Sequence, residues 1–249
     1  MRLQLSTWQE VESYLGRSKG IVIPIGSTEQ HGPNGLIGTD AICPETIAFG
    51  MAGEIEVLIG PTQAIGMAQH HMAFPGTMTL RPSTLVAVLR DQVMSLARHG
   101  FERIYFLNGH GGNVATVMAA FSEIHAETSL EIGPRHGRPV RCKLRNWYDL
   151  PGPREISKEL FGASEGSHAT PSEVSLSYYA YPEFQKQAQM SPKVAPRGGF
   201  HDAEDYRRRY PDGRIGSDPS LASVDAGRRL YEAAVKDGIA DYQDFLSAA

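Results

Sequence analysis

Hydrophobic positions along the chain alternate between two patterns. Short apolar runs typical of buried strands occur at residues 21–25, 57–59, 103–107 and 140–145. Longer stretches between them carry apolar residues at helical spacing, most clearly from Leu85 to Leu96. This alternation of strands and helices predicts an α/β protein.

Turn and cap residues mark where the helices begin and end. A capping-box pattern at residues 6–10 is expected to open a short helix that runs to about Leu15. Ser83 is expected to cap the helix that follows it, and Gly100 to end that helix. Further helices are predicted at residues 41–52, 114–127, from 174 onward and at 220–237.

Two segments fit neither pattern. Residues 63–79 are rich in Gly, His and Met and too irregular to assign, and residues 192–219 are predicted to be loop-like. The basic run at 207–209 is typical of a solvated face, with contact to a neighbouring subunit as the alternative. Because no repeat, linker or low-complexity tract interrupts the chain, residues 1–249 are expected to form a single domain.

Composition narrows the class of protein. A chain of 249 residues buries a sizeable core without disulfides or metals as staples. The net charge of −4, from 24 basic and 28 acidic residues, provides no basic surface for nucleic acid or for a membrane. Two distant cysteines and the lack of a long apolar run predict a cytoplasmic, unexported protein.

The first stretch with candidate chemistry is residues 26–40, which follows the strand predicted at 21–25. It contains Glu29, His31 and Asp40. In an extended segment Glu29 and His31 point the same way, and carboxylate with imidazole suits Zn²⁺, Mn²⁺ or Fe²⁺. The alternatives are solvated loop side chains and, for Asp40, a cap on the next helix.

A second stretch, Asn108-Gly-His-Gly-Gly-Asn113, joins a predicted strand to a predicted helix. Ligands of α/β proteins bind outside the carboxyl ends of strands, which favours a functional role for His110 as a metal ligand. A phosphate-binding loop is the alternative, but the P-loop lysine and the dinucleotide-binding spacing are both missing.

The third stretch, Glu165-Gly-Ser-His-Ala-Thr-Pro-Ser-Glu173, precedes a predicted helix. His168 is a candidate proton shuttle or substrate contact, and Glu173 a candidate metal ligand. Glu173 alternatively complements the dipole at the start of that helix. Before this stretch, residues 146–149, which include Trp147, begin a loop that could line a pocket.

Together these stretches resemble the signature of the creatininase (creatinine amidohydrolase) family. The matching motifs are Gly26-Ser-Thr-Glu-Gln-His-Gly-Pro, Gly38-Thr-Asp40, His71-Met-Ala-Phe-Pro-Gly-Thr77, Asn108-Gly-His-Gly-Gly-Asn113 and His168-Ala with Glu173. They occur in the family's order and cover roughly residues 5–185.

The resemblance implies a three-layer α/β/α fold with a mainly parallel sheet, a homo-oligomer, typically a hexamer, and two divalent metal ions. Zn or Mn is expected, with Fe as an alternative. Glu29, Asp40 and His110 would bind one ion, and His31 would bind the second together with a bridging Asp40. His168 matches the histidine that moves substrate protons. His71 and Trp147 are the candidate substrate-binding residues.

This chain departs from the family pattern at two positions. Creatininase has a second-metal glutamate where this chain has Gly112, so that either Glu173 substitutes for it or the second site is weaker or empty. Asn34 stands where many members have His. Relatives with two glycines in this loop include enzymes that act on formamides and on small peptides.

The resemblance implies hydrolysis of a non-peptide C–N bond, in creatinine or a related small cyclic amide, by attack of a metal-bound water. The alternatives are a formamide hydrolase or a small-peptide peptidase of the same family. A non-catalytic metal-binding protein and a structural assembly subunit are the alternatives outside enzymes.

Overall fold

The core of the protein is a sheet of three parallel strands, described by a computed structural model that covers residues 1–130 and 140–248. The strands are β1 (Gly20–Ile25), β2 (Arg103–Asn108) and β3 (Arg141–Asn146), in the order β1-β2-β3. Ile25, Asn108 and Asn146 lie level with one another, so the carboxyl ends of all three strands meet at one edge.

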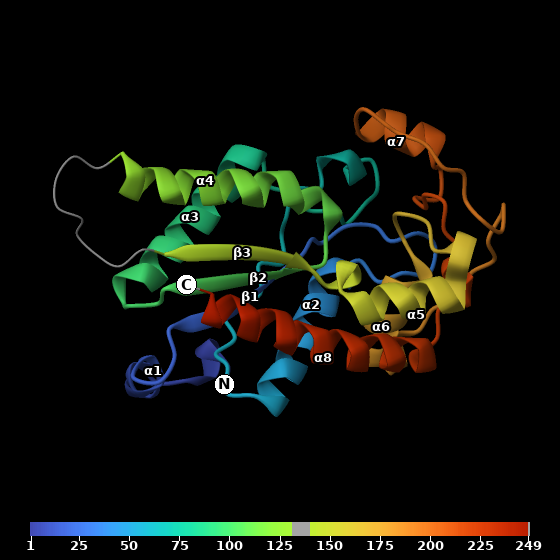
Figure 1. Ribbon diagram of the computed structural model, residues 1–249. Coiled ribbons are helices and arrows are strands. Elements are labelled where there is room, and N and C mark those ends of the chain that lie inside the picture. The colour runs from blue at the N-terminus through green and yellow to red at the C-terminus, as the bar shows by residue number, and fades with distance from the viewer. Residues whose placement is uncertain (131–139, 249) are drawn as a thin grey trace.

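Helices cover both faces of this sheet (Figure 1). On one face lie α3 (Pro82–Arg98) and α4 (Val114–Ser129), which pack against each other. On the other lie α2 (Thr39–Glu54) and the long α8 (Val224–Ser247), with α6 (Pro171–Ala180) packed against both. The arrangement confirms the predicted three-layer α/β/α fold with a parallel sheet.

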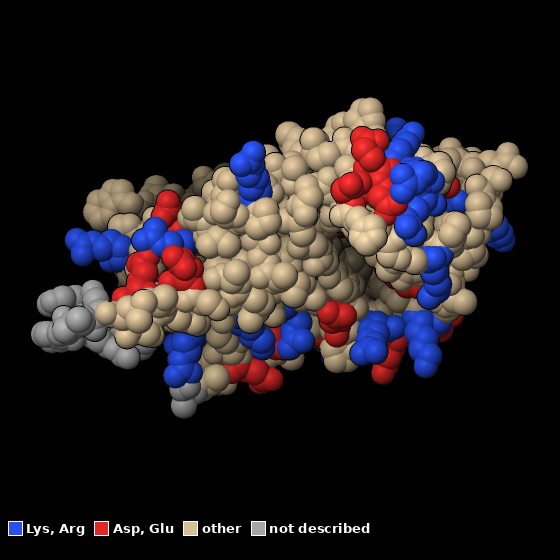
Figure 2. All heavy atoms as spheres, turned by 90° about the horizontal axis from the view of Figure 1, so that it is seen from above, with Lys and Arg blue, Asp and Glu red and all other residues tan. Residues whose placement is uncertain are grey.

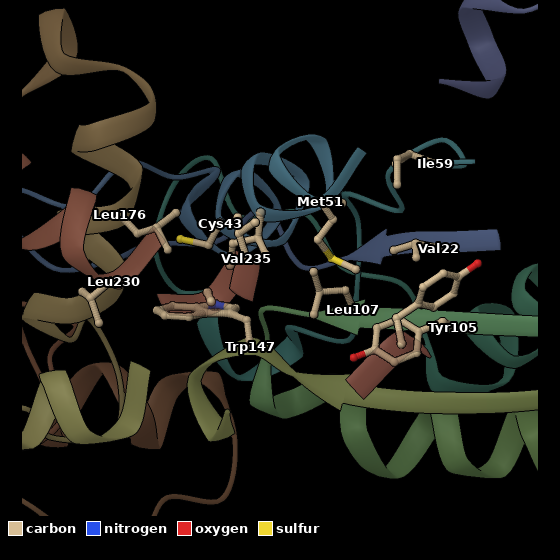
Figure 3. Close-up of a cluster of buried hydrophobic side chains, with 14 of the residues drawn as sticks. Val22, Cys43, Met51, Ile59, Tyr105, Leu107, Trp147, Leu176, Leu230 and Val235 are labelled. Atoms are coloured by element: carbon tan, nitrogen blue, oxygen red, sulfur yellow. The ribbon is translucent and has the colours of Figure 1, made fainter. Parts of the chain in front are cut away.

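The side chains of each strand divide between the two layers, as the period of two residues in a strand requires. From β1, Ile21 and Ile23 pack toward α3 and α4, whereas Val22 packs toward α2 and α8. From β2, Tyr105 and Leu107 join Val22 in the second cluster, which Figure 3 shows. The two hydrophobic layers fix the sheet, and thereby the loops at its carboxyl edge.

Three further α-helices complete the fold in the described part of the chain. The first is α1 (Trp8–Leu15), whose capping box between Thr7 and Glu10 confirms the sequence prediction. The others are α5 (Pro151–Phe161), which follows β3 and packs on α8, and α7 (Ala203–Arg209), which lies apart from the sheet (Figure 1). No helix within residues 1–130 and 140–248 is long and apolar enough to cross a membrane.

The structure corrects several element predictions. Ser83 does not cap α3; Pro82 takes the first helical position, where its missing N–H costs nothing, and Arg81 is the N-cap. Of residues 57–59, predicted as a strand, only Ile59 forms β-bridges, one to Val22 of β1 and one to Arg2. The segment expected to be loop-like contains α7, and α5 was not predicted at all.

Candidate metal centre

The three chemical stretches of the sequence converge at the carboxyl edge of the sheet. Glu29 and His31 lie in the loop after β1, and Asp40 lies in the first turn of α2. His110 follows β2 directly. The fourth contribution comes from the start of α6, where Glu173 lies in the first turn. This is the position at which open α/β sheets bind their ligands.

Asp40 lies between two histidines. Its Oδ1 is 3.0 Å from His31 Nε2, and its Oδ2 is 2.9 Å from His110 Nδ1. The two oxygens therefore face two different imidazoles, which is the geometry of a carboxylate that bridges two neighbouring positions. Since Asp40 is only 3% exposed, no solvent competes for these contacts.

Two glycines allow the strand ends to approach Asp40. A Cβ built on Gly26, after β1, would lie 2.1 Å from the Asp40 carbonyl oxygen, and one built on Gly109, after β2, would lie 2.0 Å from the same atom. Real Cβ atoms do not approach backbone that closely. Only glycine at both positions lets β1, β2 and the first turn of α2 meet around this carboxylate.

Glu29, His31, Asp40, His71, His110, His168 and Glu173 are called the cluster below. Three of its histidines are oriented in the same way, each by a backbone carbonyl. His31 Nδ1 lies 3.0 Å from the Glu29 carbonyl oxygen, and His110 Nε2 lies 3.0 Å from that of Met67. His168 Nε2 lies 2.9 Å from the carbonyl oxygen of Gln30. Because a carbonyl only accepts, each of these nitrogens carries a proton, and the opposite nitrogen of each ring faces a carboxylate. Metal-binding and catalytic histidines are held in this way.

Glu29 lies at the centre of the cluster and is completely buried. Its Oε1 is 3.0 Å from His71 Nε2 and 3.7 Å from His168 Nδ1, and its Oε2 is 3.3 Å from His110 Nε2. None of these contacts is aligned as a hydrogen bond, so both oxygens lack a hydrogen-bond partner in the described structure. A buried carboxylate in this condition is costly unless a cation binds it.

The position of Glu173 is compatible with both of the roles that the sequence left open. Its Oε1 accepts a hydrogen bond from Thr170 N at 2.6 Å, while Thr170 Oγ1 accepts from Glu173 N at 3.2 Å, which together make a capping box for α6. The same Oε1 lies 3.9 Å from His31 Nε2. Its carboxylate therefore caps the helix and also joins His31 and Asp40 in a group that could hold a metal ion.

His71 and His168 are linked through the side chain of Gln30. Gln30 Nε2 lies 2.9 Å from His71 Nδ1, 2.8 Å from His168 Nε2 and 3.0 Å from the Gly213 carbonyl oxygen. Gln30 Oε1 accepts from Gly32 N. The rings of His71 and His168 stack at 4.3 Å. Since the amide donates to His71 Nδ1, the remaining ring nitrogen Nε2 carries the proton that faces Glu29.

The electrostatics follow from burying carboxylates and imidazoles together. Burial lowers the pKa of His31, but Asp40, Glu173 and Glu29 outweigh this effect and raise it to about 10. Burial also lowers the pKa of His110, which Glu29 and Asp40 raise to about 9. Although burial raises the pKa of Asp40, His31 and His110 bring it well below its usual range. The carboxylates thus require positive charge beside them.

The other two histidines are held neutral. Burial, reinforced by neighbouring histidines, lowers the pKa of His71 to about 2 and that of His168 well below its usual value. The backbone after His168 adds a local constraint, since Ala169 adopts a φ of 51°, a conformation that non-glycine residues rarely occupy. The neutral ring of His168 therefore leaves its Nδ1 unprotonated.

A cavity of about 1080 Å³ opens onto the cluster. His71 is only 1% exposed and lies at the inner end, while Trp147, also 1% exposed, contributes an edge and otherwise packs in the core shown in Figure 3. Figure 2 looks down on the hollowed part of the surface, which Lys, Arg, Asp and Glu side chains flank. Both predicted substrate-binding residues therefore border the cavity.

Several residues at this site were missed by sequence reasoning. His70 groups with Glu29 and His110 as a possible metal-binding set, and its signal was the pair of adjacent histidines at 70 and 71. Gln30 lies within the family motif at residues 26–33, but a glutamine amide does not by itself indicate catalysis or metal binding. Glu165 lines the cavity, and burial raises its pKa to about 7.

The two departures from the family pattern have structural counterparts. A Cβ on Gly112 would lie 2.3 Å from His110 Nε2 and 2.9 Å from the Met67 carbonyl oxygen, so the observed orientation of His110 requires glycine there. Asn34 is buried, and its Nδ2 donates to the Pro219 carbonyl oxygen at 2.9 Å. It holds the chain ahead of α8 and does not join the cluster.

The donor set fits a divalent metal. Zinc–ligand distances of about 2.0–2.2 Å place neighbouring ligand atoms of a tetrahedral site about 3.3 Å apart. The contacts of Asp40 with the two histidines at 2.9 and 3.0 Å, and of His31 with Glu173 at 3.9 Å, lie around that value. Together with the unpartnered oxygens of Glu29, they make the cluster suitable for a borderline metal such as Zn²⁺ or Mn²⁺.

Comparisons with known proteins agree with the sequence resemblance. The family model described as "Creatininase: Creatinine amidohydrolase" matches residues 4–241. The mycofactocin precursor peptide peptidase of Mycolicibacterium smegmatis is 28% identical over 227 residues, which cover 89% of this chain and 83% of that protein. The 3-dehydro-scyllo-inosose hydrolase of Thermotoga maritima is 26% identical over 260 residues, covering 92% and 78%.

Solved structures show the same fold. A manganese creatininase superposes with a TM-score of 0.84 at 21% identity, over 99% of each chain. A creatininase variant of the Zn-Zn type gives 0.84 at 20% identity, over 99% of this chain and 98% of that one.

Proposed function

The chain belongs to the creatininase family of hydrolases, and on that premise we propose that it is a metal-dependent amidohydrolase that cleaves a C–N bond of a small amide. Creatinine or a related cyclic amide is the first substrate class to test. Formamides and small peptides are the alternatives.

The observation that carries this proposal is the condition of Glu29. Its two oxygens are fully buried without hydrogen-bond partners, and three ring nitrogens lie within 3.7 Å. A protein that used these residues only for packing would leave no carboxylate in this state, because each unsatisfied charged oxygen is strongly destabilising. A bound divalent cation removes that cost.

Two adjacent metal positions are proposed, and they share Asp40. Glu29, Asp40 Oδ2 and His110 Nδ1 would hold one ion. His31 Nε2, Asp40 Oδ1 and Glu173 would hold the second, with Glu173 in place of the glutamate that Gly112 lacks. Relatives solved with manganese and with zinc support the choice of these two metals.

Bound ions would polarise the amide carbonyl and make water a stronger acid at neutral pH. The protein's own contribution is proton transfer at His168. Its Nε2–H is fixed by the Gln30 carbonyl, so Nδ1 is available to take a proton from the attacking water and to pass it to the leaving nitrogen. His71 and Trp147 would contact the substrate.

The peptidase alternative also has specific support. The cavity of about 1080 Å³ is at the upper end of the range for drug-sized ligands, and the relative from M. smegmatis is a peptide peptidase. A substrate larger than creatinine would fit this space.

The experiment begins with metal stoichiometry per chain, measured by mass spectrometry on the purified protein and after loading with Zn²⁺ or Mn²⁺. The loaded protein is then assayed with creatinine, other cyclic amides, N-formyl compounds and dipeptides. Asp40→Asn should lose metal and turnover together, whereas the control Asp91→Asn, at an exposed position of α3, should keep both.

Asp40→Asn with full metal content and full activity would refute the assignment. Metal binding without turnover of any amide would instead favour a non-catalytic metal-binding protein. The homo-oligomer, a hexamer by resemblance, remains a prediction that light scattering of the purified protein tests. Chelation that dissociates the oligomer of an inactive protein would favour the structural role.

A further inference from the structure

The charged residues of α5 are segregated between its two sides. Arg154, Ser157 and Lys158, at positions i, i+3 and i+4, all line the cavity that opens onto the metal cluster. The acidic residues of the same helix do not line it, and Glu159 instead pairs with Arg229 of α8 at 2.9 Å. One side of the cavity therefore presents two cations and a hydroxyl group.

Neither cation is neutralised by the protein. Within residues 1–130 and 140–248, the side chains of Arg154 and Lys158 form no ion pair or hydrogen bond, and both are exposed. Most other arginines near this end of the molecule are paired: Arg208 and Arg209 contact Asp205, and Arg214 contacts Asp212. We call the side of the cavity formed by Arg154, Ser157 and Lys158 the α5 wall. Its positive charge is thus available to a ligand.

The acidic groups of the cavity do not cancel this wall. Asp40 and Glu173 belong to the metal cluster, and Glu165 accepts a hydrogen bond from Ser172. The exposed Asp149 also lines the cavity, but its Oδ2 accepts from Asn146 Nδ2 at 2.8 Å, and it lies more than 4.0 Å from both cations. The cavity therefore has acidic groups around the metal cluster and free cations along α5.

We propose that Arg154 and Lys158 form a subsite for an anionic group of the substrate, a carboxylate or a phosphate remote from the amide that is cleaved. This inference rests on the proposed hydrolase function and specifies its substrate class. An arginine binds such oxyanions through two parallel N–H groups, and a lysine adds a point charge. Ser157, one turn along the same face, can donate a further hydrogen bond.

The subsite can be tested without turnover. Zinc-loaded protein is titrated with inorganic phosphate and with acetate by isothermal titration calorimetry. The variants are the double substitution Arg154→Gln with Lys158→Gln, and a control pair, Arg98→Gln with Lys236→Gln, at exposed positions that do not line the cavity. Any anion held by the metal binds all three proteins alike, so only the difference reports on the α5 wall.

The affinity for at least one anion should fall on the order of tenfold in the Arg154/Lys158 variant and remain unchanged in the control. Loss of phosphate binding alone identifies a phosphate subsite, and loss of acetate binding a carboxylate subsite. Equal affinities in all three proteins, or no binding to the unsubstituted protein, would overturn the proposal.

A second assay separates this proposal from the hydrolase function itself. N-formyl-ω-amino acids of increasing chain length are compared with their primary amides, which share the same formamide and differ in one negative charge. If the protein hydrolyses acid and amide with the same kcat/KM at every chain length, the hydrolase stands and the subsite falls. If anions bind through the α5 wall but no amide is hydrolysed, the subsite stands and the hydrolase assignment falls.

Discussion

The ring of His168 is held by the backbone of Gln30, whose carbonyl oxygen lies 2.9 Å from His168 Nε2 across 138 residues of sequence. The side chain of Gln30 meanwhile contacts His71 Nδ1 and the Gly213 carbonyl oxygen. One residue thus positions two of the three histidines that lie next to Glu29, by its main chain and by its amide.

Gln30→Met should therefore impair turnover without removing metal. The main-chain contact with His168 remains, but His71 loses the donor that fixes its tautomer and His168 loses its contact with the amide nitrogen. Losses of about 10–100-fold are typical for such supporting residues. The measurement is kcat with metal content determined in parallel. Gln185→Met, at an exposed position, is the control. Unchanged kcat in Gln30→Met would show that the amide has no positioning role.

Glu173→Gln separates the two roles of this side chain. Glutamine at the same position still accepts from Thr170 N, so the capping box and α6 should survive. A neutral amide is a much weaker ligand, so metal content should fall from two ions to one. Glu10→Gln, at the equivalent position of the capping box of α1, should leave metal content unchanged. Two ions in Glu173→Gln would make the residue a helix cap only.

Gly112→Ala tests how tightly the loop holds His110. The added Cβ would lie 2.3 Å from His110 Nε2, so the ring must turn and weaken its contact with Asp40. We expect metal affinity to fall about 10-fold or more, as for other disturbances of ligand orientation. Gly53→Ala is the matched control, because a Cβ there meets nothing within 4 Å and the helix favours alanine. Equal metal affinity in the two variants would contradict the prediction.

Glu165 should make stability depend on pH. Burial raises its pKa from 4.5 to about 7 against the opposing hydrogen bonds of Ser172 and Thr170, so the folded protein keeps a proton that the unfolded chain releases near pH 4.5. This stabilising contribution is complete below about pH 4.5 and is lost as the pH rises through 7. As the pH rises over this range, the free energy of unfolding of Glu165→Gln should fall by roughly 1–3 kcal/mol less than that of the unsubstituted protein.

Urea unfolding of both proteins at several pH values measures this difference. Glu123→Gln, at an exposed position of α4, serves as the control. Parallel pH profiles for Glu165→Gln and the unsubstituted protein would show that Glu165 is ionised in the folded state.

The sequence predicted the cluster well because its members lie close to strand ends. Glu29, His31 and His110 follow short apolar runs that are typical of buried strands, and parallel strands bring their carboxyl ends together. The family motifs then connected these stretches with Glu173. What the sequence could not reveal were contacts across long separations, such as those of Gln30 with His71 and His168.

The missed helices have local physical reasons. The start of α5, Pro151-Gly-Pro, is typical of a turn, although proline at the first helical position is compatible with a helix. In α7, seven residues long and mostly charged, only Asp205 and Tyr206 are buried, so no apolar periodicity was available. Residues of both helices line the cavity, and that is why the sequence indicated the cluster of His, Glu and Asp side chains but not the α5 wall.

The absence of side chains at Gly26 and Gly109 has a mechanical consequence. The main chain of Asp40 is held between the ends of the neighbouring strands β1 and β2 at distances that leave no room for displacement. The inner end of the cavity is therefore stiff. Adjustment to ligands of different size is expected at Phe200 and His201, which line the cavity from a segment, residues 182–202, that forms few regular elements. In hydrogen exchange, we expect the backbone amides around Asp40 to exchange slowly for a site at the edge of the sheet, and those of residues 182–202 to be among the fastest to exchange.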